Sequence, residues 1–300
     1  MTSISISKGS LTLAGLLYKP ITTASSKTRA VIIVHPGGGV KEQTAALYAT
    51  KLAEQGFTAV CYDASFQGES GGEPHFLEDP AERVSDVWFV VDYLQQQDFV
   101  DPDKIVVVGI CAGGGYAVAA AKADHRLKAV ATVSMVNIGA SARLGWYGKE
   151  QASQHINSLE QAAAQLTAEA GGADRVCAPY VPPQIDSTTP ADLCEANDYY
   201  LTSRAQHPRA ENKMLFKSFP RMLVFDAFHL TDIFLTQPTL LIAGESAGSL
   251  WHSLELDQKI RGKAKKVILP NCAHMDLYDK LDFVDTAVTE IAQFFKISLV

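Results

Sequence analysis

The chain has 300 residues, of which 47% are hydrophobic and 20% charged, a balance that is typical of globular proteins and excludes wholesale disorder. Its 33 acidic side chains outnumber its 26 basic ones, giving a formal net charge of −7. This surplus argues against a nucleic-acid partner and against a polybasic membrane-surface protein. No apolar run approaches the roughly 18 residues of a membrane-spanning helix, so no membrane partner is expected.

The first 135 residues alternate strand and helix signals at the spacing of βαβ units, which predicts a mostly parallel sheet. In chain order the predicted strands cover 11–18 (as an edge strand), 30–34, 58–63, 105–109 and 128–133. Helices are predicted over 41–55, from Asp79-Pro80 onward and over 112–122, because apolar residues recur there at helical spacing or a cap signal is present.

The alternation breaks between residues 137 and 216, where a helix candidate over 158–170 is followed by a proline-rich stretch. This length and irregularity favour an inserted helical cap over a structureless loop. Strands over 239–243 and 265–269 and a last amphipathic helix then resume the pattern. The predicted organisation is one α/β core, residues 1–136 and 217–300, interrupted by a cap, residues 137–216.

Five cysteines, at positions 61, 111, 177, 194 and 272, are odd in number, scattered and without a CxxC pair. In a chain this long, that pattern predicts reduced thiols and a cytoplasmic location. The N-terminal residues also lack the charged start and apolar block of a secretory signal.

Gly109-Ile110-Cys111-Ala112-Gly113 joins a predicted strand to a predicted helix. A Gly-x-nucleophile-x-Gly turn in this context is a nucleophile elbow, here with cysteine as the nucleophile. The sharp turn needs small residues two before and two after the nucleophile, and the helix N-terminus favours the thiolate of Cys111. The alternative is a buried structural cysteine in a glycine-rich connection.

A second glycine-rich turn, His35-Pro36-Gly37-Gly38-Gly39, follows the strand over 30–34. Its backbone N–H groups can face a developing oxyanion together with the N–H of Ala112. We take Gly38 as the donor from this turn, with Gly37 and Gly39 as alternatives. A phosphate-binding loop would need the Lys-Ser/Thr ending that is missing here, and an ordinary tight turn is the remaining possibility.

His274 follows the last predicted strand, where the histidine of a nucleophile–acid–histidine triad falls in the chain. It is predicted to take the thiol proton and to return one to a leaving group. Cys272 beside it lacks further ligands at metal spacing, so neither a metal nor another cofactor is expected.

The acid is the least defined member, because Ala247 replaces the usual aspartate three residues beyond the glycine that ends the strand over 239–243. We take Glu245, at the end of that strand, as the acid. Asp232 precedes the strand and belongs at the opposite end of the sheet, and Asp276 is too close in sequence to His274 to orient it. A Cys–His pair without a strong third member is an alternative, since a thiol ionises more readily than a hydroxyl.

These motifs, in this order, resemble the α/β-hydrolase superfamily over nearly the whole chain, and the cysteine elbow resembles its dienelactone hydrolase-like members. A closer likeness is to the fungal polyketide transferase/thiohydrolase family. It is carried by the segments HPGGGVKEQ (35–43), DASFQGESGG (63–72), NIG (137–139), GWYG (145–148) and HMDLYD (274–279). The resemblance implies an α/β-hydrolase fold, with a mostly parallel sheet flanked by helices and an inserted cap.

The resemblance also implies an enzyme that accepts a polyketide acyl group from a synthase as a thioester, then hydrolyses or transfers it. The expected partner is a small-molecule acyl substrate, including one bound to the carrier protein of a polyketide synthase. The expected reaction forms an S-acyl enzyme at Cys111. The runner-up is a dienelactone hydrolase-like or general carboxylesterase, and a homodimer is left open.

Phe66 follows a strand at the expected catalytic edge, where ligands bind in such sheets. Trp146 and Tyr147 begin the cap. All three are candidate pocket residues, with ordinary core or cap packing as the alternative. Two other classes stay open: a non-catalytic receptor with this fold, and a redox or metal role in which Cys61 or Cys272 approaches Cys111.

Overall fold

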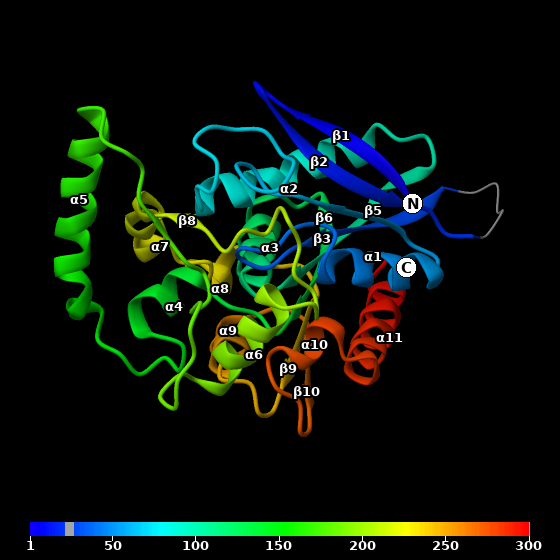
Figure 1. Ribbon diagram of the computed structural model, residues 1–300. Helices are drawn as coiled ribbons and strands as arrows, with labels where there is room; N and C mark the ends of the chain where they lie inside the picture. The colour runs from blue at the N-terminus through cyan, green and yellow to red at the C-terminus, as the bar shows by residue number, and fades with distance from the viewer. Residues whose placement is uncertain (22–26, 300) are drawn as a thin grey trace.

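An eight-stranded sheet forms the centre of the protein (Figure 1), whose computed structural model describes residues 1–21 and 27–299. The strand order is β1-β2-β4-β3-β5-β6-β9-β10. β1 and β2 pair antiparallel, as do β2 and β4, and every later pairing is parallel. The strands are β1 (Thr2–Lys8), β2 (Leu11–Tyr18), β3 (Thr28–Val34), β4 (Thr58–Tyr62), β5 (Val100–Ile110), β6 (Leu127–Val133), β9 (Thr239–Gly244) and β10 (Ala264–Leu269).

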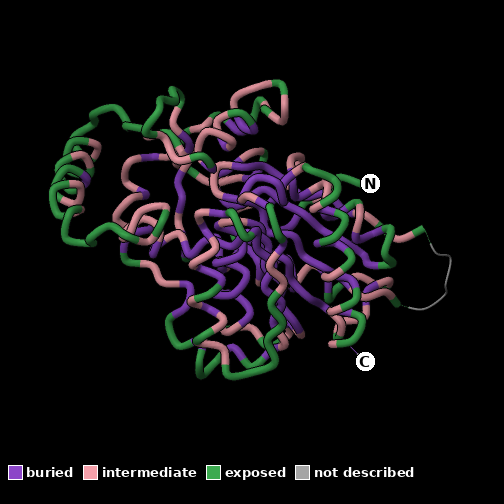
Figure 2. The backbone as a smooth tube through the Cα atoms, turned by 90° about the horizontal axis from the view of Figure 1, so that it is seen from below, coloured by how far each residue is buried: buried purple, intermediate pink, exposed green. Residues whose placement is uncertain are grey.

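Helices cover both faces of this sheet because its central strands are apolar on both sides. Val31 and Ile33 of β3 belong to the cluster shared with α1 (Thr44–Glu54) and α11 (Leu281–Ser298). Ile32 and Val34 face the other way and pack with α2 (Pro80–Gln95), α3 (Ala112–Ala123) and α9 (Leu250–Lys259). Figure 2 shows the sheet as the buried centre of the chain. No helix within the described residues is long and apolar enough to cross a membrane.

The predicted strands and helices of the core are present, with one correction at the start of the chain. Residues 11–18 are not an edge strand, because β1 pairs with residues 11–17 and forms the edge itself. The helix predicted at Asp79-Pro80 begins there, and the Asp79 carboxylate accepts the N–H of Ala81 at 3.0 Å. This contact is the N-cap that the sequence predicts.

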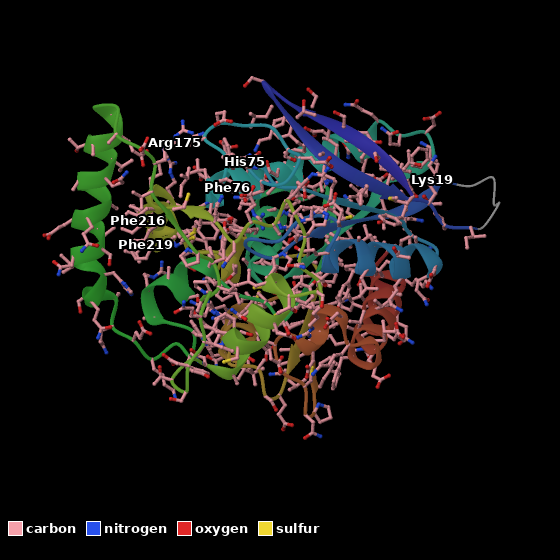
Figure 3. The ribbon with its side chains drawn as sticks, viewed as in Figure 1. Lys19, His75, Phe76, Arg175, Phe216 and Phe219 are labelled. Carbon is pink, nitrogen blue, oxygen red and sulfur yellow. The ribbon has the colours of Figure 1, made fainter. Side chains whose placement is uncertain are left out.

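The chain between β6 and β9 leaves the sheet and forms the inserted region in which the cap was predicted. Its longest helix, α5 (Ile156–Ala170), stands to one side of the molecule and is mostly exposed (Figures 1 and 2). It is anchored near its start, where His155 meets a phenylalanine ring edge to face. That ring belongs to Phe219, the first residue of α7, which is labelled in Figure 3. The other elements are α4 (Ile138–Leu144), η1 (Ala152–His155), β7 (Cys177–Ala178), α6 (Ala191–Leu201), β8 (Met214–Leu215), η2 (Phe216–Ser218), α7 (Phe219–Val224) and α8 (Thr231–Phe234). The boundaries at 136 and 217 stay a prediction.

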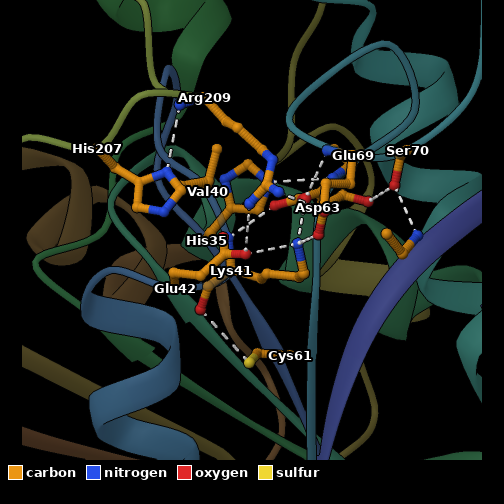
Figure 4. A network of polar contacts seen from close by, with 12 residues as sticks. His35, Val40, Lys41, Glu42, Cys61, Asp63, Glu69, Ser70, His207 and Arg209 are labelled. Carbon is orange, nitrogen blue, oxygen red and sulfur yellow. Dashed lines mark hydrogen bonds and ion pairs between the residues drawn. The ribbon is translucent and has the colours of Figure 1, made fainter. Parts of the chain in front are cut away.

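A buried lysine fixes the loop that follows β4, next to the glycine-rich turn at residues 35–39 (Figure 4). Lys41 Nζ donates to Asp63 Oδ2 at 2.7 Å and to Glu69 Oε2 at 2.6 Å. The backbone N–H groups of Lys41 and Glu69 also donate to the Asp63 carboxylate. A Cβ at Gly68 would lie 2.3 Å from that carboxylate, so the tight turn requires glycine there. The Lys41 cluster is therefore a structural clamp that joins two loops at the carboxyl edge of the sheet.

Candidate active site

Cys111 occupies the sharp turn between β5 and α3, at the carboxyl edge of the parallel sheet. Its φ of 54° and ψ of −124° lie outside the regions that non-glycine residues usually adopt. Backbone hydrogen bonds hold this conformation: Cys111 N–H donates to Val133 O, and the N–H groups of Gly114 and Val136 donate to Cys111 O. The strand, strained turn and helix predicted around Cys111 are all present.

Gly113 lets α3 pack against β3 directly below the turn, since a Cβ there would lie 2.2 Å from Val34 O. We expect Gly113→Ala to lower the free energy of unfolding by about 3 kcal/mol, because backbone atoms cannot move aside cheaply. Gly262→Ala is the control: its new Cβ would have its nearest neighbour at 3.4 Å, and a change below about 0.5 kcal/mol is expected. Urea unfolding measures both variants, and equal stabilities would contradict this description of the turn.

Two backbone N–H groups point at the sulfur of Cys111, those of Ala112 and Gly37. They are the donors that an oxyanion on a group attacked by this sulfur would meet. The structure therefore selects Gly37, the alternative, over Gly38. Gly38 lies one residue further on with a φ of 71°, and its Cα faces the ring of Tyr180 instead.

Tyr278, on the short helix α10 (Asp276–Asp279), lies between Cys111 and His274. Its hydroxyl is 3.3 Å from His274 Nε2 and is hydrogen-bonded to the thiol of Cys111. Burial raises the pKa of Cys111, and the hydrogen bonds from Tyr278, Ala112 and Gly37 partly offset this. Burial also raises the pKa of Tyr278, so its hydroxyl is protonated at neutral pH. The Tyr278 hydroxyl thus contacts the imidazole and acts on the thiol.

His274 is almost fully buried, and its second ring nitrogen is held by a serine. Nδ1 lies 2.6 Å from the hydroxyl of Ser249, the residue that precedes α9. The ring of Trp146 meets the imidazole edge to face at a centroid distance of 5.0 Å. Burial lowers the pKa of His274 to about 4, and the negative charge of Asp192 opposes that shift. The imidazole is therefore neutral at pH 7, with Nε2 directed toward Tyr278.

Glu245 is not brought to His274. Its backbone N–H donates to Leu269 O and so extends the β9–β10 pairing, while its side chain is turned to solvent. Ser249 takes the place at Nδ1 for which Glu245 was predicted. The carboxylate whose charge acts on the imidazole belongs instead to Asp192 on α6, and its Oδ1 lies 3.5 Å from the backbone N of His274. Sequence reasoning missed Asp192 and Ser249, because neither lies at a characteristic distance from a motif.

A cavity of about 290 Å³ opens in front of Cys111. Of the three candidate pocket residues, Trp146 lines it, whereas Phe66 and Tyr147 do not: Phe66 packs under Gly72, and Tyr147 is half exposed. The walls come from the sheet edge, from α10 and from the cap. The lining residues are Gly37, Cys111, Ala112, Val136, Ile138, Ser141, Trp146, Tyr180, Val181, Asp192, Leu193, Ala196, Tyr200, His274, Met275 and Tyr278.

A buried polar cluster supports the glycine-rich turn from behind. Arg83 donates to the backbone carbonyl of His35 at 2.7 Å, and its guanidinium forms an ion pair with Glu78. Glu78 in turn accepts the hydroxyls of Tyr116 and of Tyr180 from the cap, at 2.5 and 2.7 Å. This cluster joins α2, α3 and the cap to the turn that carries Gly37. These buried contacts hold the turn in the position from which its N–H groups can stabilise an oxyanion.

Buried neutral histidines predict that the protein loses stability as the pH falls. Burial lowers the pKa values of His35 and His274, and that of His252 to about 3. Because the unfolded chain binds protons at about pH 6.5 and these folded-state imidazoles do not, stability falls as the pH drops below that value. For His252 alone, a loss of about 2 kcal/mol is expected between about pH 7 and pH 5.

His252→Leu tests this prediction, since both ring nitrogens of His252 lack a hydrogen-bond partner within the described chain. The variant is expected to be at least as stable as the wild type at neutral pH and to lose less stability on acidification. Urea unfolding at several pH values measures the difference. A pH dependence unchanged by His252→Leu would contradict the assignment of a depressed pKa to this residue.

Comparison with known proteins assigns the chain to a family. The model of the dienelactone hydrolase family matches residues 13–192, a span that includes the glycine-rich turn and the Cys111 elbow. The chain belongs to the dienelactone hydrolase family. It is therefore a hydrolase of that family with an α/β-hydrolase-like fold, as the order of its motifs predicts.

Two bacterial proteins match nearly the whole chain. The uncharacterized protein YcjY of Escherichia coli K12 is 40% identical over 291 residues, which cover 96% of this chain and 95% of YcjY. The crystal structure of the hypothetical protein PA2218 from Pseudomonas aeruginosa has a TM-score of 0.92 at 30% identity, covering 99% of this chain and 93% of that one. A fungal relative, the acyltransferase drtE of Aspergillus calidoustus, is 34% identical over 125 residues, 41% of this chain and 39% of drtE.

Proposed function

We propose that this protein is a cysteine-dependent acyl hydrolase or acyltransferase that acts on thioesters or esters through an S-acyl intermediate on Cys111. The proposal rests on the environment of the Cys111 sulfur. Cys111 sits in a strained turn, two backbone N–H groups converge on its sulfur, and Tyr278 connects it to a neutral histidine. Nucleophile, oxyanion donors and base are the three parts that acyl transfer requires.

In the first step the thiol proton of Cys111 passes to the Tyr278 oxygen while the Tyr278 proton passes to His274 Nε2. The thiolate attacks the substrate carbonyl, and the N–H groups of Ala112 and Gly37 stabilise the oxyanion. When the tetrahedral intermediate collapses, the leaving thiol or alcohol takes the proton from the imidazolium. Water or an acceptor alcohol then gives its proton to His274 and attacks the acyl-cysteine, which releases the acyl group and restores the thiol.

The cavity favours a short, uncharged acyl group. Its volume of about 290 Å³ is at the small end of ligand pockets. Aromatic and aliphatic side chains dominate its walls, and the lining residues include Asp192 but neither lysine nor arginine. A polyketide chain delivered as a carrier-protein thioester is the specific substrate we propose. The match to the acyltransferase drtE supports the acyl-transfer part of this proposal.

Hydrolysis of a lactone or simple ester is the second candidate, favoured by the match to the dienelactone hydrolase family. A dienelactone that bears a carboxylate would find no lysine or arginine on the lining residues and would face the carboxylate of Asp192. Neutral esters and lactones do not meet this obstacle.

Turnover of three substrate series separates the candidates: acyl-thioesters, oxygen esters and lactones, each with acyl chains from acetyl to dodecanoyl. We expect thioesters with short, neutral chains to have the highest kcat/KM, and Cys111→Ala to remove their turnover. Cys194→Ala, at a half-buried cysteine of the cap outside the cavity lining, is the matched control and should keep wild-type rates. A preference for carboxylate-bearing lactones would contradict the proposal.

A further inference from the structure

Asp192, the second residue of α6 in the cap, has a buried carboxylate that binds to segments far apart in sequence. Oδ2 accepts the indole N–H of Trp146 at 2.9 Å and the backbone N–H of Gly248 at 2.7 Å. Oδ1 lies 3.5 Å from the backbone N of His274. The carboxylate thus connects α6 and the Trp146 segment of the cap to two core loops, the one after β9 and the one that carries His274.

No lysine or arginine pairs with Asp192 among the ion pairs of the described residues, which distinguishes it from Asp276, whose partner is Lys280. Its neighbours donate hydrogen bonds without bringing a full positive charge. A buried carboxylate that accepts hydrogen bonds but has no cationic partner stabilises a cation that forms nearby. The group beside it that becomes a cation during acyl transfer is the imidazole of His274.

Ser249 and Asp192 divide between them the work of the acid in a triad. The Ser249 hydroxyl holds Nδ1 at 2.6 Å and so fixes the direction of the ring. Asp192, bound to the adjacent Gly248, supplies the negative charge. The order Cys111, Asp192, His274 also preserves the nucleophile–acid–histidine order of this fold. At the ordinary position of the acid, after β9, the chain has Ala247.

We propose that Asp192 is the acid of this site, a positioning residue that acts through His274 and is supplied by the cap. This inference rests on the proposed acyl transfer at Cys111. It places one member of the catalytic set on the inserted segment, so the base reaches full strength only when the cap lies against the core. The titratable groups that face His274 are Asp192 from α6, Tyr278 from α10, His252 from α9 and Cys111 from the elbow.

Gly248 offers a way to move the carboxylate without changing any charge. A Cβ at this position would lie 2.5 Å from the indole nitrogen of Trp146 and 2.8 Å from Asp192 Oδ2. Gly248→Ala must therefore push Asp192 and Trp146 away from the loop after β9. Asp192→Asn does the converse, because it keeps the shape and removes the charge.

The pH dependence of kcat/KM for a short acyl-thioester distinguishes positioning from simple packing. Without the charge of Asp192, the pKa of the His274 imidazolium falls, so the acidic limb of the profile should move down by about one pH unit. The plateau should fall by about 10²-fold, because the base is weaker and its cation less stabilised. Gly248→Ala should lower the acidic limb and the plateau as well, but by smaller amounts. Asp186→Asn, at an exposed cap residue, should change neither the acidic limb nor the plateau. A lower plateau with an unmoved acidic limb would overturn the proposal.

Alkylation of Cys111 by iodoacetamide, followed on the Cys111 peptide by mass spectrometry, gives a readout that needs no substrate. Near pH 7 its rate follows the population of the thiolate–imidazolium pair, which falls tenfold for each unit by which the pKa of the imidazolium falls. We expect about tenfold slower alkylation in Asp192→Asn. An unchanged rate would overturn the role of Asp192, whereas slower alkylation in a protein that forms no acyl adduct would overturn the proposed function and leave the role intact.

Discussion

Replacing Cys111 with alanine is expected to lower kcat/KM for a short acyl-thioester by about 10⁴-fold or more, because the group that forms the covalent intermediate is lost. Cys111→Ser is expected to be nearly as inactive, although it differs by one atom. Burial lowers the pKa of His274 to about 4, and so weak a base cannot activate a hydroxyl as it can a thiol. Steady-state kinetics at constant pH measures both losses.

Two controls keep this result specific. Cys194→Ala alters a cysteine outside the cavity lining, and its rate should match the wild type. Circular dichroism and urea unfolding should show that Cys111→Ala and Cys111→Ser fold like the wild type, since the strained turn is held by backbone hydrogen bonds. A folded Cys111→Ala variant with wild-type turnover would contradict the assignment of the nucleophile.

Replacing His274 with alanine is expected to lower kcat/KM by about 10³-fold or more, because the thiol loses its base and the leaving group loses its acid. The substitution also leaves a space beside Tyr278 and Ser249 at the wall of the cavity. Exogenous imidazole is therefore expected to restore part of the activity, with a rate that rises with its concentration. The measurement is kcat/KM with and without imidazole, and a high rate without it would contradict the role of His274.

Tyr278→Phe examines the connection between the two residues. If the tyrosine hydroxyl relays the proton, its removal should lower kcat/KM by about 10²-fold, a smaller loss than for His274→Ala. Tyr199→Phe is the matched control, since Tyr199 packs against Tyr278 but its hydroxyl accepts the backbone N–H of Thr44. Equal activities of Tyr278→Phe and the wild type would mean that thiol and imidazole meet directly in the reacting complex.

The core of the fold could be predicted because local patterns determine it. The apolar run of β3 and the helical spacing in α1 each reflect burial against elements nearby in the chain. The elbow could be predicted from its local glycine spacing: a Cβ at Gly109 would meet Gly113 O within the turn, while Gly113 lets the turn pack against Val34. Residues 11–18 lie inside the sheet because β1 pairs with them, and the alternating serine and isoleucine residues of β1 are a period-2 strand signal that could have identified this pairing.

The details of the site depend on contacts that no local pattern encodes. The N–H of Gly37 rather than that of Gly38 acts on the sulfur, and a Cβ at Gly38 would lie 2.7 Å from the ring of Tyr180, a residue of the cap. Glu245 has a suitable place in the sequence, but its side chain leaves the sheet toward solvent. Asp192 reaches the histidine only through the tertiary position of the cap. Tyr278 is the exception: its i+4 spacing from His274 on a predicted loop-to-helix junction is a local signal that could have identified it.

The most direct test of the central claim is the intact mass of the protein, quenched within the first turnovers after mixing with a short acyl-thioester. Wild-type protein should gain the mass of one acyl group, and peptide mapping should place that group on Cys111. Cys111→Ala should gain nothing, and Cys194→Ala should behave as the wild type does. Turnover without an adduct on Cys111, or an equal adduct on Cys111→Ala, would contradict acyl transfer through this cysteine.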